Sequence, residues 1–172
     1  MKDVMILTMT AGGGHNAAAS ALAESFAHDE TLVGPEGNEV RVESLDVATM
    51  SPRVVRHVYN DGYLRMIDRD PQLYGWMYHR FDRRPGRRRR AANKTLERFG
   101  SRRFIRYLRR RNPHVCVCTH FYPAQIALDL RKRGKLSSRV VMVITDYQPH
   151  DFWILEGVDE YATGPDPPQA QV

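Results

Sequence analysis

Cysteine is scarce in this sequence, and long apolar segments are missing. Only two of the 172 residues are cysteines, Cys116 and Cys118, and they alternate with valines in a strand-like run. Both would face the same side of a strand, where a disulfide between them would be strained, so we expect two buried free thiols in a reducing compartment. No apolar run reaches the roughly 18 residues of a membrane-spanning helix, and residues 1–9 resemble a strand rather than a signal peptide. These absences predict a cytoplasmic protein without disulfides or transmembrane segments.

Ligand spacings typical of metal centres are missing as well. The sequence has seven histidines, but none of them forms an H-x-x-x-H motif, and the cysteines do not form C-x-x-C. Histidines and aspartates that gather at one edge of a sheet could bind zinc, but nothing in their spacing favours it. We therefore expect no metal ion and no bound cofactor.

Acidic residues are too few to balance the basic ones: 20 Asp and Glu stand against 26 Lys and Arg, a net charge of +6. Residues 80–111 hold fourteen arginines and one lysine but only two acidic residues. A solvated helix face is the ordinary interpretation of such a run, yet this imbalance favours an anionic partner, either a membrane surface or nucleic acid. The preceding stretch is rich in aromatic residues, which either cap the core or favour a membrane interface. The candidate membrane contacts are Tyr74, Trp76, Tyr78, Arg87, Arg88, Arg89 and Arg90.

Short apolar runs alternate with helical patterns along the chain. Strands are predicted at 4–9, 39–45, 114–119, 139–145 and 158–163. Helices are predicted at 17–28, 52–68, 88–111 and 124–132. This alternation predicts one Rossmann-like, three-layer α/β domain over residues 1–163, with a mainly parallel sheet and right-handed crossovers. The polar, proline-rich residues 164–172 are expected to form an irregular tail.

A glycine loop follows the first predicted strand. Gly12, Gly13 and Gly14 precede His15 and an alanine-rich helix. We expect the glycines to adopt positive φ and to let another group approach the backbone closely. The helix that follows would direct its unpaired N–H groups toward an anion or a polar ligand oxygen. The loop formally fits the dinucleotide fingerprint G-x-G-x-x-A, although a glycine turn that merely joins a strand to a helix would look the same.

Polar side chains recur just after the predicted strands. They are His15, Asp46, His120, Asp146 and His150. Ligands of open α/β sheets bind at the carboxyl ends of the strands, so these residues predict a shared cleft there. A carboxylate could orient or charge a histidine, as in general-base catalysis, whereas each residue taken singly could simply cap a strand end.

Three stretches carry a resemblance to a known family. They are GGGHNAAASAL at 12–22, THFYPAQIAL at 119–128 and VITDYQPHDFWILEGVDEYAT at 143–163. In these stretches the chain resembles the amino-terminal domain of the monogalactosyldiacylglycerol synthase and processive diacylglycerol glucosyltransferase family. The resemblance implies one half of a GT-B fold, in enzymes that move a sugar from a UDP-sugar to diacylglycerol or a related lipid at a membrane. It also implies a protein that is peripheral on the inner face of the cell membrane.

The resemblance also implies roles for single residues. His15 would be the base that takes the proton of the acceptor hydroxyl, with Asp146 and His120 lining the same cleft. Gly12, Gly13 and Gly14 would lie near the donor phosphates. His150 and Trp153 would meet the acceptor or lipid headgroup, and residues 63–111 would contact the anionic membrane.

A complete enzyme of this type needs a second domain, which would bind most of the UDP-sugar. No such domain is expected within these 172 residues, so the chain should be inactive without one. The first alternative function is a dinucleotide-dependent oxidoreductase, but Asp46 lies more than 30 positions beyond the glycines instead of about 20. The second alternative is a nucleic-acid-binding module, which only the charge supports, so no nucleic-acid partner is expected.

Overall fold

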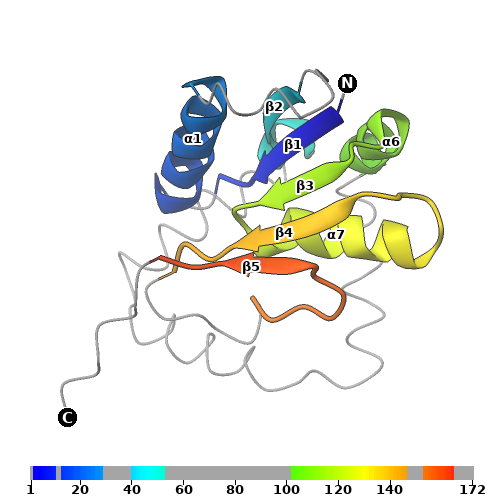
Figure 1. Ribbon diagram of the computed structural model, residues 1–172. Coiled ribbons are helices and arrows are strands. Elements are labelled where there is room, and N and C mark those ends of the chain that lie inside the picture. The colour runs from blue at the N-terminus through cyan, green and yellow to red at the C-terminus, as the bar shows by residue number, and fades with distance from the viewer. Residues whose placement is uncertain (1, 11–12, 29–39, 53–101, 147–152, 165–172) are drawn as a thin grey trace, which may run out of the picture.

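The computed structural model describes residues 2–10, 13–28, 40–52, 102–146 and 153–164 (Figure 1). Within them, five strands form one sheet in the order β2-β1-β3-β4-β5, and every pairing is parallel. The strands are β1 Lys2–Thr8, β2 Val40–Asp46, β3 Val115–Cys118, β4 Arg139–Val143 and β5 Glu160–Ala162. Each lies within or overlaps a predicted strand, so the predicted parallel α/β sheet is confirmed.

Helices cover both faces of this sheet. Helix α1 (Gly13–His28) lies on one side, and α6 (Arg102–Arg111) and α7 (Phe121–Lys132) lie on the other (Figure 1). A short 3-10 helix, η2 (Val47–Met50), follows β2. None of the helices in the described ranges is both long enough and apolar enough to cross a membrane. The predicted helix at 52–68 lies outside the described residues except for its first position, as does the part of 88–111 before Arg102.

The alternation of strand residues explains the three layers. Cys116 and Cys118 face the core beside α6 and α7, whereas Val117 faces the core beside α1. Both thiols are fully buried and free, as predicted, and burial raises the pKa of Cys116 to about 11. Because the thiolate is the reactive form, these cysteines are packing residues rather than nucleophiles.

Two helices begin earlier than the sequence pattern indicated. Helix α1 begins at Gly13 rather than 17, and α7 begins at Phe121 rather than 124. In α7 the His120 side chain is the N-cap, and Pro123 occupies the first turn, where a missing N–H costs no helical hydrogen bond. Gly134, with φ of +64°, ends α7 as expected, because the left-handed conformation suits a residue without Cβ.

Helix α6 is strongly amphipathic. Phe104 and Leu108 are fully buried, while five arginines are exposed: Arg102, Arg103, Arg106, Arg109 and Arg110. The helix is tied to the sheet by Glu43 of β2, which accepts a hydrogen bond from Tyr107 and pairs with Arg111 at 3.0 Å. The described part of the arginine-rich segment therefore packs by an apolar stripe and carries five arginines on its exposed face.

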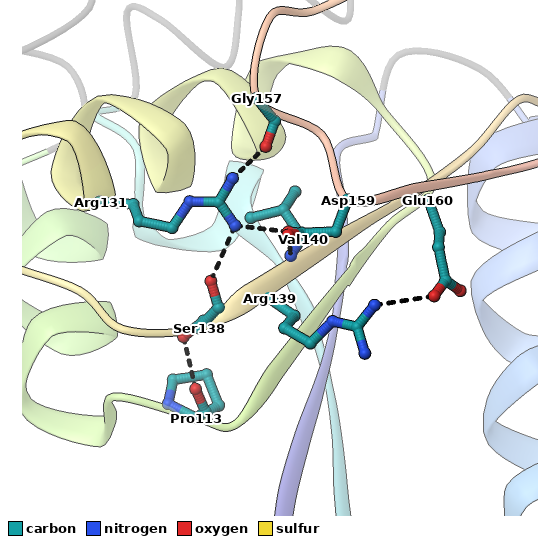
Figure 2. A network of polar contacts seen from close by, with 8 residues as sticks. All are labelled: Pro113, Arg131, Ser138, Arg139, Val140, Gly157, Asp159 and Glu160. Atoms are coloured by element: carbon teal, nitrogen blue, oxygen red, sulfur yellow. Dashed lines mark hydrogen bonds and ion pairs between the residues drawn. The ribbon is translucent and has the colours of Figure 1, made fainter.

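A polar network fixes the amino ends of β4 and β5 (Figure 2). Arg131 of α7 donates to the carbonyl oxygens of Ser138 and Gly157 and pairs with Asp159. Asp159 in turn accepts the backbone N–H of Val140 at 2.7 Å. Gly157 has a φ of +93°, a conformation that a residue with Cβ would adopt only with strain. The network joins α7, β4 and the entry to β5 on the side of the sheet away from the strand carboxyl ends.

Candidate active site at the carboxyl edge of the sheet

Two histidines meet where the strand order reverses. The chain leaves β1 for β2 on one side and returns to β3 on the other, so β1 and β3 flank the point at which α/β sheets bind ligands. His15 follows β1 and His120 follows β3, and their ring centroids lie 4.8 Å apart in an edge-to-face arrangement. Trp153 lies 5.8 Å from His15 and Phe121 stacks on His120 at 4.3 Å. The structure therefore brings together His15 and His120, which the sequence placed in one cleft, and adds Trp153 beside them.

The first turn of α1 is held in place by side chains that follow β1 and β2. Asp46 accepts the backbone N–H of Thr10 at 3.1 Å, that of Ala48 at 2.9 Å, and the Thr10 hydroxyl. Asn16 donates to Thr10 Oγ1 at 2.9 Å and its amide oxygen lies 3.0 Å from the Thr8 hydroxyl. Asp46 therefore caps η2 and orients the start of α1, which fixes the position of His15 indirectly.

His15 is half-buried among groups with opposing effects on its charge. Burial lowers the pKa of His15 below its ordinary value, whereas the Asp146 carboxylate and a hydrogen bond with the Thr119 backbone raise it. The net shift is downward, so the imidazole is neutral at neutral pH. His15 Nδ1 lies 2.5 Å from Thr145 Oγ1, just beyond β4. A neutral imidazole near a carboxylate has the properties of a general base.

His120 has a structural task that its position after a strand did not predict. Its Nδ1 accepts the backbone N–H of Tyr122 at 3.1 Å, so the neutral ring must carry its hydrogen on Nε2. The side chain is 4% exposed, and burial followed by the nearby His15 lowers the pKa of His120 to about 3. Because Nδ1 is engaged and the ring resists protonation, His120 is poorly suited to act as a base.

Asp146 and Trp153 form a pair. The Trp153 indole N–H donates to Asp146 Oδ2 at 2.8 Å, and the Trp153 side chain is 1% exposed within the main core. Asp146 therefore acts on His15 through its charge while it is held by the indole. The Trp153 side chain packs against His15 and His120 and is buried. Its predicted contact with the lipid headgroup is not tested by this packing and stays a prediction.

The glycines do not adopt the backbone conformation that we expected. Gly13 and Gly14 are the first residues of α1, and neither has positive φ, because the helix begins four residues earlier than predicted. Among the described residues, a Cβ added at either position would meet no heavy atom within 4 Å beyond its chain neighbours and the adjacent helix backbone. The expectation of positive φ is thus wrong for these two residues, but the side of each glycine where a Cβ would stand is open.

Several predicted contacts lie outside the described residues. They are Gly12, His150, Tyr74, Trp76, Tyr78, Arg87, Arg88, Arg89 and Arg90. Among the residues that the structure does describe, no three His, Cys, Asp or Glu side chains are grouped so as to hold a metal ion.

Sequence reasoning missed Thr145 and Phe121, both of which contact the histidines. Thr145 directly precedes Asp146, so its place after β4 was visible, but a threonine at a strand end carries no chemical signal by itself. Phe121 was assigned to the loop before α7, and its stacking on His120 follows from the earlier start of that helix.

Comparison with known proteins agrees with this geometry. Residues 15–166 match the family model of monogalactosyldiacylglycerol (MGDG) synthase, a match that includes His15, His120 and Thr145. A search of curated proteins and a search of solved structures returned no match. The family comprises GT-B glycosyltransferases of glycolipid biosynthesis, and a parallel, Rossmann-like sheet is the fold of one half of such an enzyme. Because the match covers most of the chain, the protein belongs to the MGDG synthase family, as its amino-terminal domain.

Proposed function

We propose that this domain binds the lipid acceptor of a membrane-associated glycosyltransferase that transfers a hexose from a UDP-sugar to diacylglycerol. The observation that carries the proposal is the His15 imidazole, held in its neutral form at the strand-order reversal beside the open space at Gly13 and Gly14. Most of the donor contacts would come from a second domain of the family fold. Family membership favours this function over a dinucleotide-dependent oxidoreductase.

His15 acts as the general base in this mechanism. The neutral ring takes the proton of the acceptor hydroxyl as that oxygen attacks the sugar carbon and UDP leaves. The nearby Asp146 carboxylate favours the imidazolium that forms, since opposite charges attract strongly in a partly buried site. The space above Gly13 and Gly14 lets phosphate oxygens approach the N–H groups of α1, where the helix dipole favours negative charge.

The exposed arginines of α6 support a membrane surface as partner. Five cations on one face of a helix suit an anionic bilayer, where each Lys or Arg near the surface contributes about 1 kcal/mol. We place the domain on the inner face of the cell membrane as a peripheral protein. The same charges also suit nucleic acid, so the two partners must be distinguished by experiment.

The transfer test uses this domain joined to a donor-binding domain of the family. Labelled UDP-glucose and UDP-galactose are incubated with the joined protein and with diacylglycerol in vesicles that contain anionic lipid. We expect a glycosylated diacylglycerol, and little or no transfer by the 172-residue chain by itself, because the donor must be held in line with the acceptor. Transfer by the isolated chain would contradict the proposal that a second domain is needed to bind the UDP-sugar.

The membrane test is vesicle sedimentation. We expect binding to vesicles with anionic lipid that weakens as salt is added, because exposed charges are screened. Replacing Arg103, Arg106 and Arg110 with Gln should weaken the binding. Replacing Lys132, Arg133 and Lys135, which are exposed at the end of α7, is the charge-matched control. Equal binding to neutral vesicles would count against the membrane proposal, and tight binding to DNA without vesicle binding would favour the nucleic-acid alternative.

A further inference from the structure

The closest polar contact of His15 comes from a residue to which neither the sequence nor the family match assigns a role. Thr145 Oγ1 lies 2.5 Å from His15 Nδ1 and connects the end of β4 to the first turn of α1, 130 positions apart in sequence. Asp146 is adjacent, but its carboxylate accepts the Trp153 indole N–H. His120 contacts the same ring edge-on and uses its own Nδ1 to cap α7. Thr145 is thus the side chain that is hydrogen-bonded to the His15 imidazole, in addition to the hydrogen bond between the ring and the Thr119 backbone.

We propose that Thr145 is a positioning residue that fixes the tautomer and the orientation of His15, so that Nε2 is the atom that receives the acceptor proton. This inference rests on the proposed role of His15 as the base. An imidazole can use either nitrogen, and a ring held at neither nitrogen can rotate away from the acceptor. With Nδ1–H donated to Thr145 Oγ1, the neutral ring keeps its lone pair on Nε2, and the imidazolium keeps the same hydrogen bond after proton transfer.

A hydroxyl is suited to this task in a way that a carboxylate is not. Oxygen Oγ1 accepts the Nδ1–H without adding a charge, so the ring is held while its pKa stays low enough for the neutral form to persist. The charged and titratable groups that face His15 are then Asp146 and His120. Asp146 favours the imidazolium form of His15, and His120 is neutral because burial lowers the pKa of its ring. Thr145 fixes the geometry and Asp146 adjusts the charge.

The direct test is nitrogen NMR of the His15 ring in the 172-residue protein, which needs no substrate. In wild type above the pKa of His15, we expect Nδ1 to be protonated and Nε2 to be unprotonated. Thr145→Val keeps the side-chain shape and removes the hydroxyl, and it should give a mixture of the two tautomers. Thr145→Ser should restore the single tautomer. Thr49→Val removes an exposed hydroxyl that bonds to the Asp46 carbonyl, and it serves as the control.

A kinetic test uses the protein joined to the donor-binding domain. Thr145→Val should lower kcat roughly three- to tenfold, the effect of one lost hydrogen bond, with little change in KM for either substrate. Thr145→Ser should recover most of the loss. A wild-type ring protonated on Nε2, or a Thr145→Val ring with an unchanged tautomer, would overturn the inference and leave the proposed function intact. Transfer that survives the loss of His15 would instead contradict the proposed base.

Discussion

Polar side chains at the amino ends of the strands interact differently from those at the carboxyl ends. We call these two sides of the sheet the amino edge and the carboxyl edge. At the amino edge, Arg131 and Asp159 pair with each other and with backbone groups, and together they join α7, β4 and β5 (Figure 2). At the carboxyl edge, His15 and His120 lie ring against ring, and burial lowers the pKa of both. The first edge neutralises charge by pairing, whereas burial at the second keeps the two histidines uncharged.

This difference separates stability from chemistry. A paired charge is held in one state, so it is useful for joining elements but not for moving protons. A neutral imidazole keeps a lone pair that can accept a proton at neutral pH. Substitutions of paired residues at the amino edge should therefore change the free energy of unfolding, and substitution of His15 at the carboxyl edge should change turnover.

The sharpest test of this separation is His15→Ala in the protein joined to a donor-binding domain. We expect kcat to fall roughly 10²–10⁴-fold, the usual cost of losing a general base. Diacylglycerol binding should change little, because the imidazole acts on the reacting hydroxyl while the acyl chains are held elsewhere. Turnover in a radiolabel assay and lipid binding in a vesicle assay measure the two effects separately.

His15→Gln is the companion variant, since it keeps a polar side chain of similar reach but no base. It should be as slow as His15→Ala. Full turnover in both variants would require another base, and His120, whose Nδ1 caps α7, is a poor candidate. His150 would then be the residue to test.

The next largest effect concerns acid stability. His120 titrates near 6.5 when unfolded but only near 3 when folded, so between these values the unfolded chain binds more protons than the native one. Stability contributed by the neutral ring is therefore complete above about pH 6.5 and is lost as the pH falls. The slope from this one group approaches ~1.4 kcal/mol per pH unit, and His15 acts in the same direction. Urea unfolding between pH 7 and pH 4 measures it.

His120→Asn should reduce that slope while keeping an N-cap for α7, because asparagine is among the preferred capping residues. His28→Asn is the control, since it removes an imidazole from an exposed position at the end of α1. An unchanged slope in His120→Asn would mean that His120 is not the group that resists protonation.

The fold could be predicted because its signals are local. Apolar runs such as Val115–Cys118 identify strands, and the predicted helix ends at 111 and 132 are confirmed, each followed closely by a residue with positive φ, Asn112 and Gly134. The start of α1 could not be predicted, because Asn16 and Thr10 fix it through a hydrogen bond that depends on Asp46, 36 positions away from Thr10. A helix boundary that depends on such distant contacts cannot be recognised from the residues next to it in the sequence.

The site could be predicted only in part for the same reason. Histidines that follow strands are visible in a sequence, so the proximity of His15 and His120 was within reach. Their different tasks were not, because the task of His120 depends on one backbone N–H and the task proposed for His15 depends on the Thr145 hydroxyl just beyond β4. Residue type and position predict where a site lies, whereas hydrogen-bond partners determine what each member does.

The smallest expected effect is a change in the free energy of unfolding at the amino edge, where Arg131 and Arg139 can be compared. Burial would raise the pKa of Asp159, but hydrogen bonds from the Val140 backbone and from Arg131 outweigh it and lower the value, which indicates a well-paired carboxylate. Arg131→Ala removes that partner together with the donors to the Ser138 and Gly157 carbonyls. Because these groups are partly exposed, we expect a loss of only about 1–2 kcal/mol in the free energy of unfolding.

Arg139→Ala is the matched control, since Arg139 pairs with Glu160 at 2.8 Å but both side chains are 63% exposed. It should cost no more than ~0.5 kcal/mol, because exposed ion pairs are weakened by water and salt. Urea unfolding at pH 7 gives both values, provided that the denaturant slope is unchanged. Neither variant should alter the tautomer of His15 at the opposite edge. Equal losses in the two variants would show that the Arg131 network is no stronger than a surface pair, and a disturbed His15 ring would show that the two edges are coupled.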